Sequence, residues 1–123
     1  MAIDSFKGLI VWQKSMTLVQ HIYRITKALP ASERFGISSQ LQRAAVSIPS
    51  NIAEGSKRSS RADFRQFCKI ALGSAAEVET QLLIVKQVYP DVTVNTELQL
   101  ISEIQKMLTS LSNRLDEKLS TIN

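Results

Sequence analysis

Residues 43–60 read RAAVSIPSNIAEGSKRSS, and this stretch decides how the chain folds. Pro49 falls inside a helical pattern, where it removes one backbone hydrogen bond and presses against the carbonyl of Ala45. We therefore predict a helix kinked at Pro49 rather than ended by it. Gly55 is predicted to end this helix, because glycine is favoured just past a helix C-terminus. The apolar positions that make the pattern are Leu41, Ala44, Ala45, Ile48 and Ile52.

Composition places the chain among single-domain helical proteins. It has 123 residues, 44% of them apolar, with only four glycines and three prolines. That is enough apolar material for a core and too little Gly and Pro for a turn-rich β-sandwich. No apolar run approaches the roughly 20 residues of a membrane span, and the N-terminus lacks the pattern of a signal peptide. The single cysteine, Cys68, is typical of a reducing cytoplasm.

Four helical segments follow from apolar periodicity and its interruptions. Pro30 stops the first segment, Ser60 with Asp63 resembles a capping box, and Pro90 stops the third. Short connections between long helices favour antiparallel neighbours. We therefore predict an all-α, antiparallel up-down four-helix bundle in one domain, 1–123. The predicted helices span residues 9–29, 38–55, 60–89 and 95–119.

Each helix has a stripe of apolar residues that is predicted to face the core. In helix 9–29 the stripe centres on Trp12, Met16, Val19 and Tyr23, widened by Leu18, Ile22, Ile25 and Leu29. In helix 60–89 it runs from Phe64 to Tyr89. In helix 95–119 it comprises Ile101, Ile104, Leu108, Leu111, Leu115 and Leu119.

The sequence offers little for catalysis, a cofactor or a metal. His21 is the only histidine and has no carboxylate three or four residues away on its helix, so we interpret it as structural. Cys68 is predicted to be a small buried hydrophobic residue. Glu77 and Glu79 stand two residues apart and point to different sides of a helix. No enzyme activity, cofactor or metal site is therefore predicted.

A polar ladder lies along one face of helix 38–55, with steps of four, four and three residues. We predict that it ties this helix to a neighbour through hydrogen bonds, since buried polar groups usually satisfy one another. The alternative is that it lines a site. Its members are Arg43, Ser47, Asn51 and Glu54.

Positive charge gathers at the turn between the second and third helices. Residues 1–69 hold eleven Lys and Arg against four Asp and Glu, a net +7, whereas residues 70–123 carry −3. This asymmetry indicates either binding to a polyanion or attraction between copies. The alternative for the turn itself is a solvated helix end. The residues predicted to contact phosphates are Lys57, Arg58, Arg61, Arg65 and Lys69, four of which repeat at steps of three and four.

A second apolar flank lies beside the core stripe of helix 60–89. It comprises Leu72, Ala76 and Leu83. A bundle helix does not need this extra width for its own core, and contiguous apolar surface usually marks an interface. We therefore predict a homo-oligomer that covers this flank.

Three segments carry a resemblance to a known family. They are VWQKS, QLQRAAVSIPSNIAEGSKRSS and DFRQFCKIALGSAAEVETQL, within residues 9–85. They closely resemble the four-helix bundle proteins encoded in intervening sequences of bacterial 23S ribosomal RNA genes, a family that includes the accessory proteins of diversity-generating retroelements. The resemblance implies a homopentameric barrel that, in the retroelement members, binds nucleic acid and a reverse transcriptase. It places Arg43, Ser47, Asn51 and Glu54 at the family's signature polar positions, and Lys57, Arg58, Arg61 and Arg65 in its basic region.

Together these observations predict a cytoplasmic, non-catalytic, homo-oligomeric scaffold that binds RNA or DNA without crossing a membrane. Binding of phosphates by the basic residues would carry little sequence information. The alternative is a protein–protein interaction module that docks a reverse transcriptase, another acidic partner or the −3 half of a second copy. The two hypotheses differ in whether the protein has measurable affinity for nucleic acid at moderate salt.

Overall fold

The computed structural model describes residues 5–122, with side chains described to residue 116. These residues contain four long helices and no strand. The all-α fold predicted from the sequence is confirmed, and the observed helix ends lie within one to three residues of the predicted ones. The helices are α1 (Ile10–Ala28), α2 (Ile37–Ser56), α3 (Arg61–Val88) and α4 (Asn95–Ile122), with short 3-10 helices η1 (Phe6–Gly8) and η2 (Ala31–Glu33).

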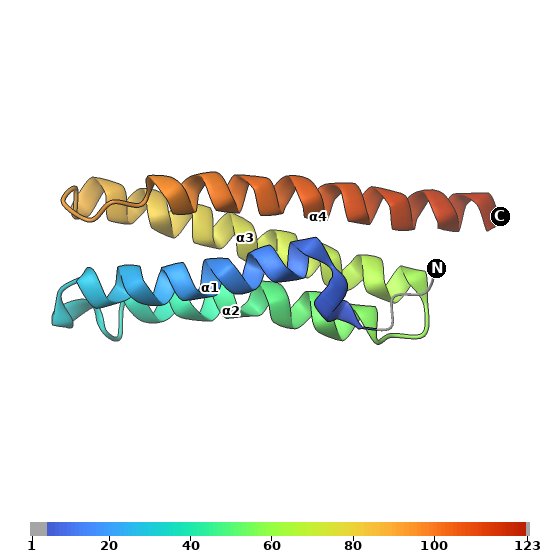
Figure 1. Cartoon of the computed structure of the whole chain (residues 1–123), viewed down its shortest axis with the longest axis horizontal. Coiled ribbons are helices and arrows are strands. Elements are labelled where there is room, and N and C mark those ends of the chain that lie inside the picture. The colour runs from blue at the N-terminus through green and yellow to red at the C-terminus, as the bar shows by residue number, and fades with distance from the viewer. Residues whose placement is uncertain (1–4, 123) are drawn as a thin grey trace.

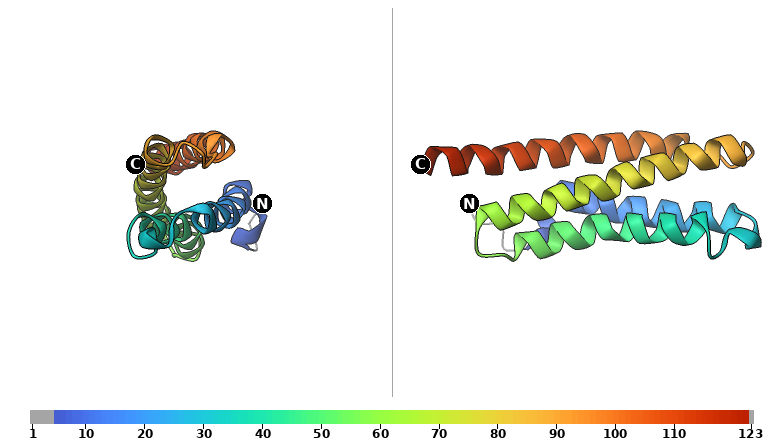
Figure 2. Two further views of the ribbon diagram at one scale, coloured as in Figure 1. Left: turned by 90° about the vertical axis from the view of Figure 1, so that its left-hand side faces the viewer. Right: turned by 180° about the vertical axis from the view of Figure 1, so that it is seen from behind.

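Consecutive helices run in opposite directions, and each lies beside the next along the chain (Figures 1 and 2). Two polar contacts join α1 to α4 and so close the bundle. Lys14 forms an ion pair with Glu103 at 2.9 Å. The Nδ1 atom of His21 lies 2.6 Å from the Oε2 atom of Glu97. Among the described residues, no helix combines the length and hydropathy that a membrane span requires.

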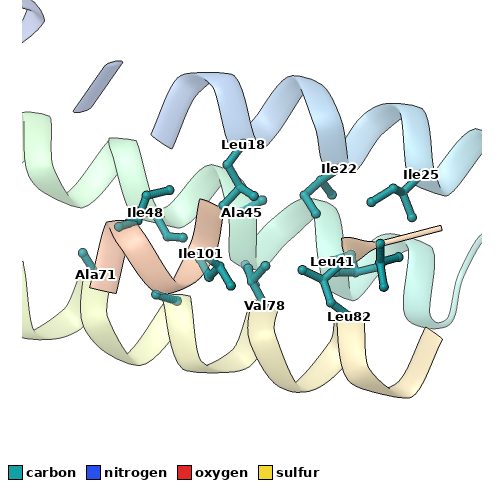
Figure 3. Close-up of a cluster of buried hydrophobic side chains, with 14 of the residues drawn as sticks. Leu18, Ile22, Ile25, Leu41, Ala45, Ile48, Ala71, Val78, Leu82 and Ile101 are labelled. Carbon is teal, nitrogen blue, oxygen red and sulfur yellow. The ribbon is translucent and has the colours of Figure 1, made fainter. Parts of the chain in front are cut away.

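The core is aliphatic and draws on all four helices (Figure 3). On α1 the buried stripe is Val11, Ser15, Leu18, Ile22 and Ile25, continued by Leu29. The predicted centre of this face was wrong in part: Trp12 and Val19 are half-buried against the core, but Met16 and Tyr23 are 40% and 43% exposed. The two stripes overlap in sequence, but the predicted one reaches the polar Thr26 after Tyr23. The observed stripe keeps its spacing of three and four to the helix end.

The apolar seam of α4 is largely as predicted. Ile101, Ile104 and Leu108 have no exposed surface, and Leu115 is 4% exposed. Leu111 is half-buried against the core. The side chain of Leu119 lies outside the described residues. At the start of α3, the amide of Asp63 donates to the Ser60 hydroxyl at 3.1 Å, so the predicted N-terminal cap is present.

Helix α2 continues through Pro49, which is buried, to Ser56. The kink at Pro49 stays a prediction. The expectation that Gly55 ends this helix was wrong: Gly55 is buried inside the last turn, and Lys57 is the C-terminal cap. A Cβ atom on Gly55 would lie 2.6 Å from the Cβ atom of Phe67 on α3. Glycine is therefore required here by the close approach of two helices, not by turn geometry.

We predict that Gly55→Ala destabilises the protein by about 1–3 kcal/mol, because the added methyl group overlaps Phe67 and forces the helices apart. Gly73, in the middle of α3, is the matched control. A Cβ atom there meets nothing within 4 Å, so Gly73→Ala should stabilise by about 0.5–1 kcal/mol. Urea unfolding of both variants measures the difference. Equal stabilisation by the two substitutions would show that the contact at Gly55 is not tight.

Candidate nucleic-acid interface

The turn between α2 and α3 holds the basic residues predicted from the sequence. Lys57 is the C-terminal cap of α2, Ser60 is the N-terminal cap of α3, and α3 begins at Arg61. Arg58 therefore precedes α3 and lies in the turn. The expectation that Arg58 extends a helical row through Lys69 was wrong, since the turn separates them. The row that does lie on one helix is Arg61, Arg65 and Lys69, which we call the basic row.

Arg58 is held by groups of its own chain. Its Nη2 atom donates to the Oε2 atom of Glu54 at 2.7 Å. Its guanidinium carbon lies 4.9 Å from the centre of the Phe67 ring. An exposed ion pair of this kind contributes little stability, but it offsets the charge of Arg58. Arg58 thus contributes less free positive charge than the sequence indicates.

Arg65 is also engaged within the bundle. Its Nη1 atom donates to the Oδ1 atom of Asp116 on α4. The side chain is 28% exposed, and its Nε atom is buried with no partner among the described residues. The resulting contact joins α3 to α4. Arg65 is therefore at least partly a structural residue.

Arg61 and Lys69 are the exposed cations of the basic row. Neither forms an ion pair with any side chain up to residue 116. The ammonium of Lys57 lies 5.9 Å from the centre of the Phe6 ring, which brings it beside the first 3-10 helix. Asp63 occupies the first turn of α3 and competes there with any bound anion. Among the side chains that the structure describes, the cations of this region without an acidic partner are thus Lys57, Arg61 and Lys69.

The polar ladder is only partly a tie between helices. The hydroxyls of Ser47 and Ser74 lie 2.8 Å apart across α2 and α3. Asn51 donates to the hydroxyl of Ser47 at 2.9 Å and to its carbonyl at 2.8 Å. Glu54 instead pairs with Arg58. Arg43 is exposed and has no hydrogen bond or ion pair among the described residues.

A polar hollow of about 370 Å³ opens between α2 and α3 beside the serine pair. Gln81 on α3 is 8% exposed, and its Oε1 atom is buried with no hydrogen-bond partner among the described residues. A buried polar atom left without a partner costs about 1–3 kcal/mol. The lining includes Gln40, Arg43 and Ser47 from α2 and Ser74, Glu77 and Gln81 from α3. Arg43 and Ser47 of the polar ladder lie in its α2 wall, whereas its α3 wall could not be predicted because it lies about thirty residues further along the chain.

His21 has a carboxylate partner that local spacing does not reveal. Its Nδ1 atom lies 2.6 Å from Glu97, which is 8% exposed at the start of α4. The two residues are 76 positions apart, so only the closure of the bundle brings them together. Glu77 and Glu79 diverge as predicted. Glu77 faces the polar hollow, and Glu79 accepts from Gln105 on α4 at 3.3 Å.

The second apolar flank divides into two parts. Leu72 is half-buried against the core of its own bundle, so part of its apolar surface is already covered within the subunit. Ala76 is exposed, and Leu83 is 46% exposed. Ala76 and Leu83 therefore stay candidate interface residues. Within the part of the chain that the structure describes, no three His, Cys, Asp or Glu side chains gather to hold a metal ion.

Comparison with known proteins places this arrangement in a family. The sequence model described as "23S rRNA-intervening sequence protein" matches residues 7–110, which cover α1 to α3 and about half of α4. The chain belongs to this family. A crystal structure of a Bacteroides thetaiotaomicron protein with unknown function, from the S23 ribosomal protein family, has 30% sequence identity and a TM-score of 0.76. The match covers 84% of this chain and 98% of the other. No curated protein matches the chain.

Membership of the 23S rRNA-intervening sequence family confirms the family resemblance carried by SIPSNIAEG and its flanking segments, while the link to retroelement accessory proteins stays a prediction. The Bacteroides thetaiotaomicron relative has the same fold over nearly its whole length and has no known function. The roles of the basic row and the polar hollow must therefore be argued from their own chemistry.

Cys68 supplies a test of the buried side of α3. Its side chain is fully buried, and this burial raises the pKa of the thiol to about 11. We predict that the folded protein resists alkylation by iodoacetamide at pH 8, whereas the urea-unfolded chain reacts rapidly.

The same shift predicts how stability depends on pH. The folded thiol holds its proton more tightly than the unfolded one. The contribution of Cys68 to the free energy of unfolding is therefore full below about pH 9 and is lost as pH rises toward 11. Cys68→Ala should remove that part of the alkaline loss in a urea titration. Fast native-state alkylation would contradict the assignment.

Proposed function

We propose that the protein is a non-catalytic, cytoplasmic, homo-oligomeric scaffold that binds the backbone of RNA or DNA. The observation that carries the proposal is the pair Arg61 and Lys69. Both are exposed on one helix next to the α2–α3 turn, and both lack acidic partners among the described side chains. Lys57 in the turn adds a third cation. Cations at this spacing suit the regular negative charge of a phosphate backbone.

The strength of such binding depends on the number of copies. Three free cations per subunit give a weak contact that salt readily screens. If several subunits share one strand, each later contact forms at a high effective concentration, and the affinity of the assembly rises steeply. The +7 charge of residues 1–69 favours the same anionic partner.

The family resemblance supports this reading. The accessory proteins of diversity-generating retroelements, which the SIPSNIAEG segment resembles, form pentameric barrels that bind nucleic acid and a reverse transcriptase. The family's own description refers to 23S ribosomal RNA intervening sequences. That description names where such proteins are encoded, so the support for nucleic-acid binding, and for a pentamer, comes from the resemblance to the retroelement accessory proteins.

Replacing Arg61 and Lys69 by alanine tests the basic row. The double variant should lower affinity for single-stranded RNA or DNA by about tenfold or more at 50–100 mM salt, because two phosphate contacts per subunit are lost. The slope of log affinity against log salt should fall by about 1.5 per subunit. Fluorescence anisotropy over a salt series measures both.

Lys86→Ala is the matched control for that experiment. Lys86 is an exposed cation on the same helix, in its last turn and far from the basic row. It should leave both affinity and slope nearly unchanged. Equal loss in the control and the double variant would indicate general electrostatics and would overturn the assigned surface.

Substitution of Leu83 tests assembly. Leu83→Asp places a charge on the flank that we propose to lie between copies, and it should convert the oligomer to monomers in sedimentation velocity. Val46→Asp is the control, since Val46 is 40% exposed and belongs to α2, whereas the flank belongs to α3. A wild-type protein that sediments as a monomer at high concentration would refute the oligomer.

A second candidate function is a protein–protein interaction module that docks a reverse transcriptase or another acidic partner. The observation in its favour is Phe35, which is 90% exposed in the α1–α2 connection, with the guanidinium of Arg34 5.4 Å from its ring centre. Exposed aromatic and arginine side chains are enriched at protein interfaces. This hypothesis requires binding of an acidic protein partner and no affinity for nucleic acid at moderate salt.

A further inference from the structure

The basic row continues along α3 into the polar hollow. Residues four apart on a helix form a ridge inclined to the helix axis, so a row of them winds from one neighbour toward another. Here the ridge is Arg61, Arg65, Lys69, Gly73, Glu77 and Gln81. Near its start Arg65 contacts Asp116 of α4, and at its end Glu77 and Gln81 line the hollow with α2. The free cations and the hollow therefore lie on one continuous path.

Gly73 leaves an open step in this path. It is exposed in the middle of a 28-residue helix, where glycine weakens the helix relative to alanine. Packing does not require it, since an added Cβ atom meets nothing within 4 Å. Between Lys69 and Glu77 the ridge thus has no side chain and consists of backbone alone. A glycine of this kind is expected where another molecule approaches the backbone closely.

The walls of the hollow present opposite chemistry to each other. Arg43 on α2 supplies only donors, and Glu77 on α3 supplies only acceptors. They form no ion pair with each other within 4 Å. The buried Oε1 atom of Gln81 is a further acceptor with no donor among the described residues. An occupant with acceptors toward Arg43 and N–H donors toward Glu77 would therefore match the charged group on each wall.

We propose that this hollow binds a guanine base of the strand whose phosphates contact the basic row. Among the bases, guanine has two neighbouring N–H groups, N1–H and N2–H, that match a carboxylate such as Glu77. Its O6 and N7 atoms are acceptors that arginine contacts, which suits Arg43. Unstacked bases of single strands are read by such side-chain contacts. The volume of about 370 Å³ lies within the range of small-ligand pockets.

This inference rests on the proposed function, and it adds a base preference to backbone binding. Backbone contacts alone carry no sequence information, so the hollow would be the source of any selectivity. It also accounts for two features that the core does not need: an exposed Arg43 with no hydrogen bond or ion pair among the described residues, and the open Gly73.

Titration with the four ribonucleoside monophosphates tests the hollow apart from the basic row. GMP should bind about tenfold more tightly than AMP, CMP or UMP in NMR titrations, with shifts concentrated at Ser74, Glu77 and Gln81. Glu77→Gln should abolish that preference, because the neutral amide offers one acceptor and two donors. Asp91→Asn, an exposed acid in the α3–α4 connection, is the matched control and should retain it. No binding by GMP, or equal binding of all four, overturns the proposal.

Two further variants separate this proposal from the proposed function. Gly73→Leu should leave helix content unchanged and weaken binding of a short oligoguanylate by about tenfold, since the side chain blocks the open step. The double alanine variant at Arg61 and Lys69 should weaken that oligonucleotide but leave the GMP preference intact. If the double variant loses oligonucleotide affinity while GMP is never preferred, the role of the basic row is supported and that of the hollow is refuted. If GMP is preferred but the double variant binds the oligonucleotide as before, the role of the hollow is supported and that of the basic row is refuted.

Discussion

Where α2 meets α3, small side chains allow the two helices to approach closely. Gly55 lies beneath Phe67, and the hydroxyls of Ser47 and Ser74 meet at 2.8 Å. The positions between and beyond these contacts are also small, including Ala44, Ala71 and Ala75. Small residues at a helix contact bring the axes together and leave long side chains only at the margins. This close contact fixes the register of α3 against α2, and every other feature of the proposed interface depends on that register.

Two consequences follow from the α2–α3 register. At the turn, it sets Arg58 between Glu54 and the ring of Phe67, so that one of the cations is already neutralised. Toward the middle of the helices, the longer side chains Arg43 and Glu77 flank the serine pair instead of covering it, and a polar hollow remains. The same packing therefore reduces the charge in the α2–α3 turn and opens a recess toward the far end of the ridge. On α3, the cations that stay free lie on the path between these two places.

The fold was predictable because apolar periodicity and its interruptions are local properties of the sequence. Pro30, Ser60 and Pro90 mark helix ends that depend on neighbouring residues alone. The failures have a common cause in contacts between distant segments. Met16 and Tyr23 are exposed because tertiary packing selected the longer of two overlapping stripes. Gly55 was predicted to end the helix, but glycine is needed there because of Phe67, twelve residues away. The partners of Arg65 and His21 lie 51 and 76 positions away, so no local spacing identifies them. The cations of the candidate site were visible in the sequence, but the pairing of Arg58 and Arg65 and the α3 wall of the hollow were not.

The two helical glycines at the α2–α3 face show how packing and function can be separated. Glycine is a poor helix former, so Gly55 departs from local helix preference. Packing explains this departure, because a methyl group at position 55 would overlap Phe67. Gly73 breaks the same rule with no such reason, since the space around it is open. A sequence that is otherwise consistent with its fold is expected to depart from local preferences mainly where function demands it. On the ridge, Gly73 lies between the exposed Lys69 and Glu77, and Glu77 has no hydrogen bond or ion pair among the described residues. A bound strand would need to cross this position.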